Sequence, residues 1–254
     1  MVQFNKDALD ELKRCKNKID KEVPEEVLND LWLATSPKEW FSNFNTTWNT
    51  SELSESGLNR KELLELIRPH RNKGELDQFI LRKLIVSVLA WGGLGTSSTN
   101  GKLAIETIKA YEGVCASLLN GLSSVEAYTK FYNLKKLKKM KGLRPAYFTK
   151  LIFFFGDQSG LIMDQWTARS TNLLLNKNEI KLERNMVSDN NSVQVYMKYL
   201  EFVSELKNKL DIQTPAKAEE LIFSCPHKNH TVKKRLGNYH EACSAWRKYV
   251  AENS

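Results

Sequence analysis

The sequence predicts an all-α protein. Apolar residues recur at intervals of three and four along most of its 254 residues, which is the spacing that gives a helix one apolar face. Ser or Thr stands near the start of several of these segments, as expected of helix N-caps. No segment alternates regularly between apolar and polar residues, so we expect at most one short pair of strands, at a position that the sequence does not fix.

The N-terminal part is predicted to form two helices followed by a loop. Residues 5–20 carry apolar side chains at helical spacing, and Pro24 suits the first turn of a second helix through residues 24–34. Residues 35–58 are rich in Ser, Thr, Asn and aromatic residues and contain few helix-forming residues. We therefore expect an ordered loop and a domain boundary there.

The middle of the chain is predicted to contain a central buried helix. Residues 74–93 have a broad apolar stripe, and two glycines end the segment sharply. Residues 102–121 and 123–133 predict two more helices, the second of which begins with Ser and Glu in a capping-box arrangement. Helical spacing then continues toward the C-terminus in residues 167–175, 191–210, 214–224 and 238–252.

The charge distribution favours a polyanionic partner. Lys and Arg number 38 and Asp and Glu number 30, which gives a net charge of +8, and no acidic residue lies between Glu126 and Asp157. A solvated helix face would give the same pattern, but a basic strip also binds phosphates because docking releases counterions. The basic residues of this interval are Lys130, Lys135, Lys136, Lys138, Lys139, Lys141, Arg144 and Lys150.

Cysteine usage and hydropathy favour a soluble protein of the cytoplasm. Cys15, Cys115, Cys225 and Cys243 lack disulfide-rich spacing, and the N-terminus lacks the apolar core of a signal peptide. No apolar stretch reaches the roughly 18 residues of a membrane span. We therefore expect a cytoplasmic monomer with no membrane partner.

Residues 134–155 predict a helix, a tight turn and a second helix. Gly142 permits a positive φ angle, and Pro145 suits the first turn of the second helix. Unpaired backbone N–H groups at such a turn, together with the helix dipole, favour an anion such as a DNA phosphate. Turn carbonyls could also hold a monovalent cation that bridges to the phosphate. The predicted DNA-binding residues are Lys139, Lys141, Gly142, Arg144 and Ala146.

This hairpin, followed by Asp164, resembles the helix-hairpin-helix DNA glycosylases, and among them the 8-oxoguanine-glycosylase branch of bacteria and archaea. The family's usual Leu-Pro-Gly-Val-Gly turn reads Met-Lys-Gly-Leu-Arg at residues 140–144, so Arg144 replaces the second glycine. The resemblance covers residues 134 to about 170. It implies a helix-hairpin-helix fold of two helical subdomains with an active-site cleft between them. With the boundary above, residues 1–58 form an N-terminal helical segment and loop, and residues 59–254 form the glycosylase domain.

Asp164 stands directly before the helix predicted after the hairpin. Asp is a favoured N-cap, so a purely structural role is available. The resemblance implies a second role, because the family's catalytic aspartate lies at a helix start just after the hairpin. Cleavage of an N-glycosidic bond builds positive charge on the deoxyribose, which a nearby carboxylate stabilises.

Lys150 is the second candidate catalytic residue. Bifunctional relatives use a lysine near the start of the second hairpin helix to form a Schiff base and cleave the strand, and alignment on Gly142 places Ala146 there. Lys150 lies one helical turn later on the same face, and helical side chains lean toward the N-terminus. A Schiff-base role and a phosphate contact both stay open, and an enzyme that leaves an abasic site is the preferred interpretation.

A glycosylase must also hold a flipped base in a pocket of aromatic and polar side chains. The candidates for this pocket are Gln165, Trp166, Trp91, Trp246, Tyr239 and His240. For each of them, packing in a helical core is the common alternative. The small polar loop with Asn100 is a candidate for filling the gap that a flipped base leaves.

Metal binding is not predicted. Cys225, His227 and His230 lie close together in the sequence, but their spacing does not match the usual zinc patterns, and residues of these types often simply pack between helices. The four-cysteine iron–sulfur loop of some related glycosylases has no counterpart. No cofactor other than the monovalent cation is expected.

The preferred function is therefore a DNA glycosylase that flips a modified base out of double-stranded DNA and leaves an abasic site. A role in defence against phage with bulky modified pyrimidines, such as glucosylated hydroxymethylcytosine, fits the divergent hairpin. Repair of 8-oxoguanine with lysine-dependent strand cleavage is one alternative. A helix-hairpin-helix module that only binds DNA is another, and a helical interaction protein is the third.

Overall fold

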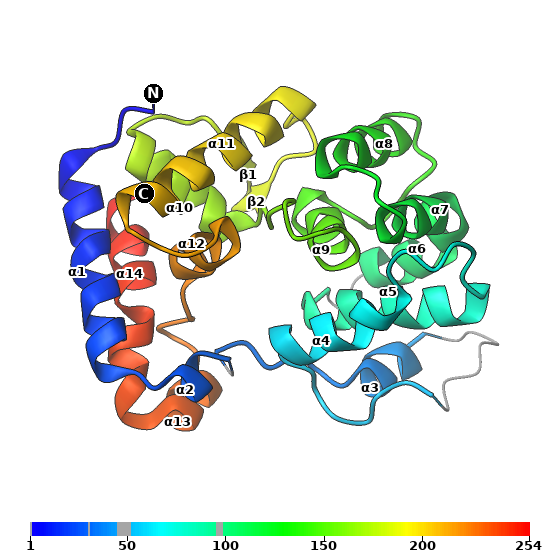
Figure 1. Ribbon diagram of the computed structural model, residues 1–254, viewed down its shortest axis with the longest axis horizontal. Helices are drawn as coiled ribbons and strands as arrows, with labels where there is room; N and C mark the ends of the chain where they lie inside the picture. Colours follow the sequence, from blue (N-terminus) through cyan, green and yellow to red (C-terminus); the bar gives the residue numbers. More distant parts are fainter. Residues whose placement is uncertain (1, 30, 45–51, 95–98) are drawn as a thin grey trace. The chain divides into compact units, whose positions relative to one another are not determined.

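The computed structural model describes residues 2–29, 31–44, 52–94 and 99–254. These residues are mostly helical, with one pair of two-residue strands (Figure 1). The prediction of an all-α protein is confirmed. No helix among the described residues is long and apolar enough to cross a membrane.

The chain forms two compact units. We call Met1–Trp32 together with Met163–Ser254 the terminal unit, and Leu33–Ile162 the middle unit. These limits differ from the boundary predicted near residue 58, because the N-terminal helices pack with the C-terminal part of the chain. The predicted cleft between two subdomains stays a prediction.

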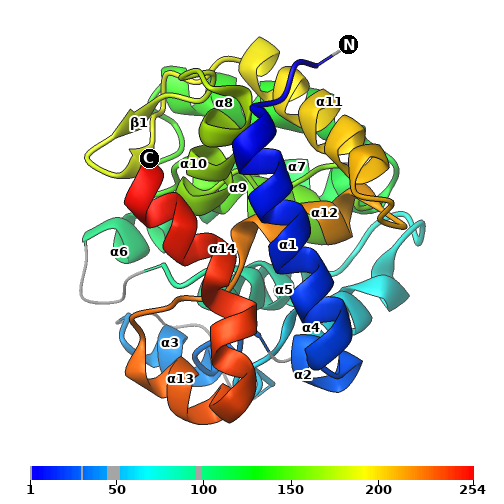
Figure 2. The ribbon, with the colours of Figure 1, turned by 90° about the vertical axis from the view of Figure 1, so that its left-hand side faces the viewer.

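The terminal unit joins helices from both ends of the chain. Its first long helix lies beside its last one, as Figures 1 and 2 both show. The helix that follows Asp164 packs against three others of the unit. The elements are α1 (Lys6–Glu22), α2 (Glu25–Asn29), α10 (Gln165–Leu175), β1 (Leu182–Glu183), β2 (Met186–Val187), α11 (Val193–Lys209), α12 (Pro215–Phe223), α13 (His230–Leu236), the short 3₁₀-helix η2 (Gly237–Tyr239) and α14 (His240–Asn253).

The middle unit is built around a buried helix, α5, as the sequence predicts. Most of α5 from Leu81 to Trp91 is buried, and it packs against α3, α4, α7 and α9. The elements are α3 (Pro37–Ser42), α4 (Arg60–Ile67), the 3₁₀-helix η1 (Arg68–His70), α5 (Gln78–Trp91), α6 (Thr99–Glu106), α7 (Ile108–Leu119), α8 (Ser124–Lys136) and α9 (Pro145–Phe155).

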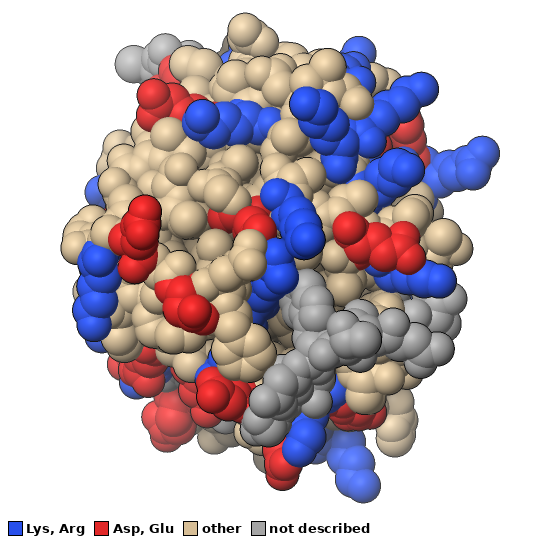
Figure 3. Space-filling model, turned by 90° about the vertical axis from the view of Figure 1, so that its right-hand side faces the viewer, with Lys and Arg blue, Asp and Glu red and all other residues tan. Residues whose placement is uncertain are grey.

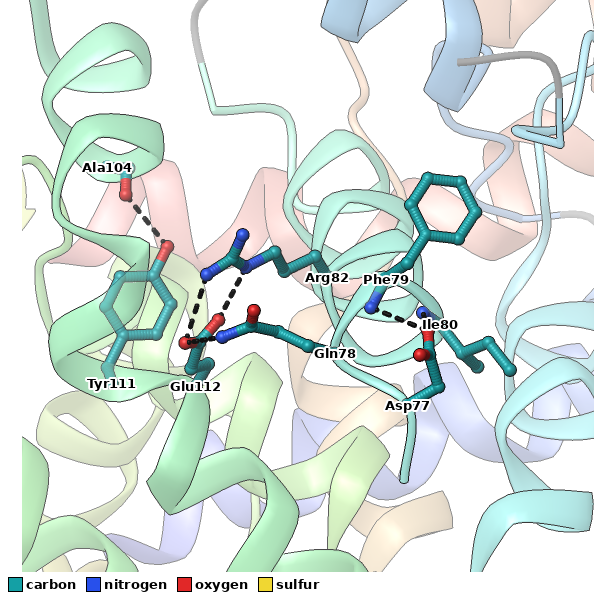
Figure 4. Close-up of polar contacts among 8 residues, drawn as sticks. All are labelled: Asp77, Gln78, Phe79, Ile80, Arg82, Ala104, Tyr111 and Glu112. Carbon is teal, nitrogen blue, oxygen red and sulfur yellow. Dashed lines mark hydrogen bonds and ion pairs between the residues drawn. The ribbon is translucent and has the colours of Figure 1, made fainter. Parts of the chain in front are cut away.

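A polar cluster fixes α5 against α7 (Figure 4). Arg82 donates two hydrogen bonds to the carboxylate of Glu112, from Nε at 2.6 Å and from Nη2 at 3.2 Å, and Gln78 donates a third at 2.7 Å. Beside it, the hydroxyl of Tyr111 donates to the carbonyl oxygen of Ala104 at 3.0 Å and so ties α7 to α6. These contacts fix α5, α6 and α7 relative to one another within the middle unit.

Three predicted elements need correction. The predicted loop contains α3, which begins because Ser36 accepts a hydrogen bond from the N–H of Glu39 (3.2 Å) and Pro37 occupies the first turn. The helix predicted to continue to residue 34 ends at Asn29. The helix predicted over residues 102–121 is two helices, α6 and α7, separated at Thr107.

The capping box predicted for α8 is confirmed. Ser123 Oγ accepts from the N–H of Glu126, and the Glu126 carboxylate accepts from the N–H of Ser123, both at 3.3 Å. These two bonds satisfy N–H groups that a helix start otherwise leaves without a partner. They fix the start of the helix that leads into the hairpin.

Candidate functional site

The hairpin joins α8 to α9 through residues 137–144, and α8 ends at Lys136. Lys138 adopts a left-handed conformation (φ 56°), its N–H donates to the carbonyl of Lys135, and the N–H of Lys139 donates to that of Leu134. This pattern is a Schellman motif, which stops a helix. Leu137, just past the end of this helix, is 64% exposed.

Gly142 lies at the closest approach of the hairpin to α6. Its φ angle is 75°, and a Cβ atom there would clash with the carbonyl oxygen of Asn100 and lie 2.6 Å from the nitrogen of Ala104. Thr107 also joins the two segments, because its hydroxyl accepts from the N–H of Lys141 at 3.1 Å and lies 3.3 Å from that residue's carbonyl oxygen. Only glycine fits this turn.

The hairpin presents the features that a phosphate needs. Among the described residues, the N–H groups of Gly142, Leu143 and Ala146 have no acceptor, and no side chain caps the start of α9. Lys139 and Lys141 are exposed beside them, and Lys and Arg side chains gather along the upper part of the face in Figure 3. Arg144 occupies the N-cap position of α9. The arrangement suits an anion at a helix start.

A lysine already contacts one of the turn carbonyls that could bind a monovalent cation. Lys135 Nζ donates to the carbonyl oxygen of Leu143 at 2.8 Å, and the carbonyl oxygen of Lys141 faces the hydroxyl of Thr107. A metal ion at the Leu143 oxygen would be repelled by this ammonium group. The turn therefore fits the predicted monovalent cation poorly.

Lys150 is buried, unlike the other basic residues of the hairpin region. It is 8% exposed, and its Nζ donates to the carbonyl oxygen of Gly92 at 3.0 Å. The ring centroids of Tyr147 and Trp91 lie 5.2 and 5.8 Å from Nζ. Ala146 lies one turn earlier on the same helix. An amine in such an aromatic, water-poor site is poorly placed for the phosphate contact that the sequence left open.

Asp164 uses one carboxylate oxygen to cap α10. Oδ1 accepts from the N–H groups of Trp166 (2.7 Å) and Thr167 (3.0 Å), and Thr167 Oγ1 accepts from the N–H of Asp164 at 2.9 Å. The residue is 7% exposed. Oδ2 has no hydrogen-bond partner among the described residues, so one oxygen fixes the side chain and the other is available for chemistry. Asp164 belongs to the terminal unit and Lys150 to the middle unit.

Comparison with known protein families matches residues 26–223 to the family described as "Putative 8-oxoguanine DNA glycosylase OGG-like protein". The chain belongs to this family. The match contains the hairpin, Lys150 and Asp164, and it indicates a DNA glycosylase that acts on DNA. No curated protein and no solved structure matches the chain.

In this OGG-like protein, two arginines surround the aromatic residue next to Asp164. The guanidinium carbons of Arg247 and Arg169 lie 4.6 and 5.3 Å from the ring centroid of Trp166. Burial lowers the pKa of Arg247 to about 10, although the negative charge of Asp164 opposes the shift. Arg247 also donates to the carbonyl oxygen of Phe223 at 2.8 Å. The cluster brings positive charge close to the candidate carboxylate.

Sequence reasoning missed Arg247 because an arginine in an amphipathic helix is usually exposed. A signal was present, since Arg247 follows Cys243 by four residues and precedes Val250 by three, which places it on the apolar stripe of α14. Arg169 and Thr107 carry no such signal. Both act through contacts with residues that are distant in the sequence.

Several residues predicted for the base pocket are packed elsewhere in the OGG-like fold. Trp246 is 1% exposed, and its indole N–H donates to the hydroxyl of Ser170 at 3.0 Å. His240 Nε2 lies 3.1 Å from the carbonyl oxygen of Pro226. Trp91 packs edge-on against Phe154, with ring centroids 4.9 Å apart. Trp246 and His240 therefore have the contacts of core residues, whereas Gln165 and Trp166 remain half-exposed beside Asp164.

The cysteine and histidine cluster has ordinary packing contacts. The N–H of Cys225 donates to the carbonyl oxygen of Cys243 at 3.2 Å, and burial raises the pKa of the two thiols to about 12 and about 11. His227 is the cluster's half-buried imidazole, and burial lowers its pKa. Within the described ranges, no three His, Cys, Asp or Glu side chains are close enough to hold a metal ion.

Proposed function

We propose that this OGG-like protein releases a modified base from double-stranded DNA by hydrolysing the N-glycosidic bond, with Asp164 as the catalytic carboxylate. The proposal rests on the different contacts of the two carboxylate oxygens of Asp164. Oδ1 accepts two backbone hydrogen bonds, whereas Oδ2 has no hydrogen-bond partner among the described residues. A carboxylate held in this way stabilises positive charge on the sugar, or orients a water molecule, without reorganising.

DNA binding and base binding are assigned to residues already described. The hairpin N–H groups, with Lys139, Lys141 and Arg144, bind phosphates of the DNA backbone. The target base leaves the stack because the glycosidic carbon is inaccessible inside a duplex. Gln165 and Trp166 are the side chains that we assign to the base pocket. The product is an abasic site.

Strand cleavage by Lys150 is a second candidate activity, favoured by the burial of its amine. An aldehyde at an abasic site reacts with a lysine amine to form a Schiff base with loss of water, and elimination of the 3′ phosphate follows. A site between Tyr147 and Trp91 keeps the amine away from bulk solvent. In this scheme hydrolytic release of the base comes first, and strand cleavage is slower.

Two substrate classes are tested first. The family description names 8-oxoguanine, which points to host repair. Glucosylated hydroxymethylcytosine would point to defence against phage with modified genomes. Purified protein is incubated with duplexes that carry either base and with plain duplex, and heating in alkali then reveals abasic sites.

Asp164→Asn tests the catalytic assignment. Asparagine keeps the helix cap, so the variant should fold and bind DNA as the wild type does, while base release falls by at least about a hundredfold. Asp77→Asn is the matched control, because Asp77 also caps a helix, accepting from Phe79 (2.8 Å) and Ile80 (3.1 Å) in the middle unit. If Asp164→Asn still released the base, Asp164 would not be the catalytic carboxylate. Binding without base release from any duplex would favour the DNA-binding module.

A further inference from the structure

Thr167 forms the second half of the helix cap that Asp164 begins. Its N–H donates to Asp164 Oδ1 at 3.0 Å, and its hydroxyl oxygen accepts from the N–H of Asp164 at 2.9 Å. The same hydroxyl donates to the carbonyl oxygen of Asp164 at 3.2 Å. Thr167 is 0% exposed. Because the two residues hold each other in this reciprocal way, the position of the candidate carboxylate depends on the rotamer of the threonine.

The hydroxyl of Tyr199 contacts this threonine from a second helix. Tyr199 lies on α11, is 1% exposed and forms a side-chain hydrogen bond with Thr167. Burial raises the pKa of Tyr199 well above its ordinary value, and the charges of Glu219 and Asp164 raise it further, although the bond to Thr167 opposes the shift. The phenol therefore keeps its proton. Since the single hydroxyl proton of Thr167 serves the carbonyl oxygen of Asp164, the tyrosine is the donor.

A third helix brings a buried carboxyl group to the same tyrosine. Glu219 lies on α12 and is 1% exposed, although glutamate is rarely buried so fully. Its charge acts on the hydroxyl of Tyr199 more strongly than the charge of Asp164 does. The helix α12 packs against both α10 and α11 (Figure 1). Three helices of the terminal unit therefore contribute buried polar side chains to one group that includes Asp164.

Stability alone does not require such a group. Buried polar side chains lose their hydration, and well-packed apolar residues of similar volume are often at least as stabilising. A fully hydrogen-bonded network does, however, fix the positions of its members. This network ends at Asp164, whose Oδ2 has no hydrogen-bond partner among the described residues. Its effect is therefore to orient the one carboxylate oxygen that is available for chemistry.

We propose that Tyr199 and Thr167 are positioning residues for base release, which hold the carboxylate of Asp164 so that Oδ2 faces the reacting sugar. This inference rests on the proposed function, since it assumes that Asp164 is the catalytic carboxylate. Neither residue touches the substrate. Both act through Asp164, because a carboxylate that is displaced or turned stabilises the developing positive charge less well.

Two substitutions at position 167 separate the hydrogen bonds from the packing. Thr167→Val keeps the shape of the side chain and loses the hydroxyl, whereas Thr167→Ser keeps the hydroxyl and loses a methyl group. The single-turnover rate of base release is measured on the modified duplex that the wild type processes. It should fall about tenfold to a hundredfold in Thr167→Val and stay within about threefold of the wild type in Thr167→Ser. The dissociation constant for a duplex with tetrahydrofuran, an abasic-site analogue with no base to release, should change by less than about twofold in both.

Thr171→Val is the matched control for the threonine variants. Thr171 lies one turn later on α10, is 1% exposed, and its hydroxyl donates to the carbonyl oxygen of Thr167 at 2.7 Å. The substitution removes a buried hydroxyl from the same helix without removing a bond to Asp164. It should release the base at the wild-type rate.

Tyr199→Phe removes only the hydroxyl of the tyrosine and should slow base release by about tenfold. Tyr111→Phe is its matched control, because Tyr111 is also fully buried and its hydroxyl donates to the carbonyl oxygen of Ala104 in the middle unit at 3.0 Å. Both variants should lower the melting temperature, since each loses a buried hydrogen bond. Only Tyr199→Phe should slow base release.

A wild-type release rate in either Thr167→Val or Tyr199→Phe would overturn the inference and leave the proposed function standing. Slower release in Thr167→Ser than in Thr167→Val would also overturn it, because packing would then matter more than the hydroxyl. Equal slowing in Tyr111→Phe would do the same, since lost stability would explain the effect. Failure of the wild type to release any base would instead reject the proposed function, and this inference with it.

Discussion

Lys150 Nζ donates a hydrogen bond to the carbonyl oxygen of Gly92 at 3.0 Å, and this bond joins α9 to the C-terminal end of α5. The lysine that follows the candidate phosphate-binding hairpin therefore has a defined position inside the middle unit. Its amine lies near two aromatic rings, and the buried residue is not part of the exposed basic strip.

We predict that Lys150 forms the covalent intermediate of strand cleavage. Wild-type protein incubated with abasic DNA and borohydride should give a stable adduct, and Lys150→Ala should give none while it still releases bases. Lys139→Ala, which removes an exposed lysine of the same hairpin, should keep the adduct. An adduct that persists in Lys150→Ala would show that another residue forms the covalent intermediate. The absence of an adduct with the wild type would also contradict the prediction.

Gly142→Ala should destabilise the protein by about 2–4 kcal/mol, because both the left-handed backbone and the contact with α6 disfavour a side chain. Gly74→Ala is the control: Gly74 has a φ angle of 76° and no atom within 4 Å of an added Cβ. It should cost only about 1 kcal/mol. Urea unfolding of both variants measures the difference, and equal costs would show that the approach to α6 tolerates a methyl group.

The Arg82–Glu112 pair should make stability depend on acidic pH. Burial raises the pKa of Glu112, but the hydrogen bonds from Arg82 and Gln78 and the charge of Arg82 outweigh it and lower the pKa below 4.5. A lowered carboxyl pKa contributes stability that is fully present above the unfolded value and is lost as pH falls through the folded value.

Glu112→Gln should therefore be less stable than the wild type at pH 7, by about 1–3 kcal/mol, and the difference should shrink as pH falls below about 4.5. Thermal unfolding between pH 3 and pH 7 checks this. Glu55→Gln, which removes an exposed partner of Lys38, should change stability little at any pH. A difference that is independent of pH would show that the charge of Glu112 contributes nothing.

DNA binding should not require a particular monovalent cation. Lys135 Nζ already lies on the carbonyl oxygen of Leu143, so exchanging K⁺ for Na⁺ or Li⁺ at constant ionic strength should leave the dissociation constant unchanged within about twofold. Lys135→Met should weaken binding, and K⁺ should then restore part of it. A strong preference of the wild type for K⁺ would contradict this account of the turn.

The helices that carry the candidate site follow from local sequence. Each of these features depends on residues that are only a few positions apart in the sequence. They are the capping box of Ser123 and Glu126, the apolar stripe of α5, the sequence of Gly142 followed by Pro145, and the helix cap formed by Asp164. Such features are predictable because the groups that satisfy each other are neighbours along the chain.

Other parts of the site could not be predicted, because their partners are distant in sequence. Arg169 contacts Asn185, which lies 16 positions later, and Thr107, between α6 and α7, contacts Lys141. The carbonyl oxygen that accepts the hydrogen bond from Lys150 belongs to Gly92, 58 positions earlier in the sequence. Whether Lys150 contacts a phosphate or sits in an aromatic site depends on that partner, so the sequence left both roles open.

The two units impose an order on synthesis. The middle unit is one continuous segment, so it can fold as soon as residue 162 has left the ribosome. The first helix, α1, has no such opportunity, because its main neighbour, α14, is made only after the whole middle unit. Its apolar side stays uncovered, or is shielded by a chaperone, until α14 has been made, and the unit that carries Asp164 is completed only then.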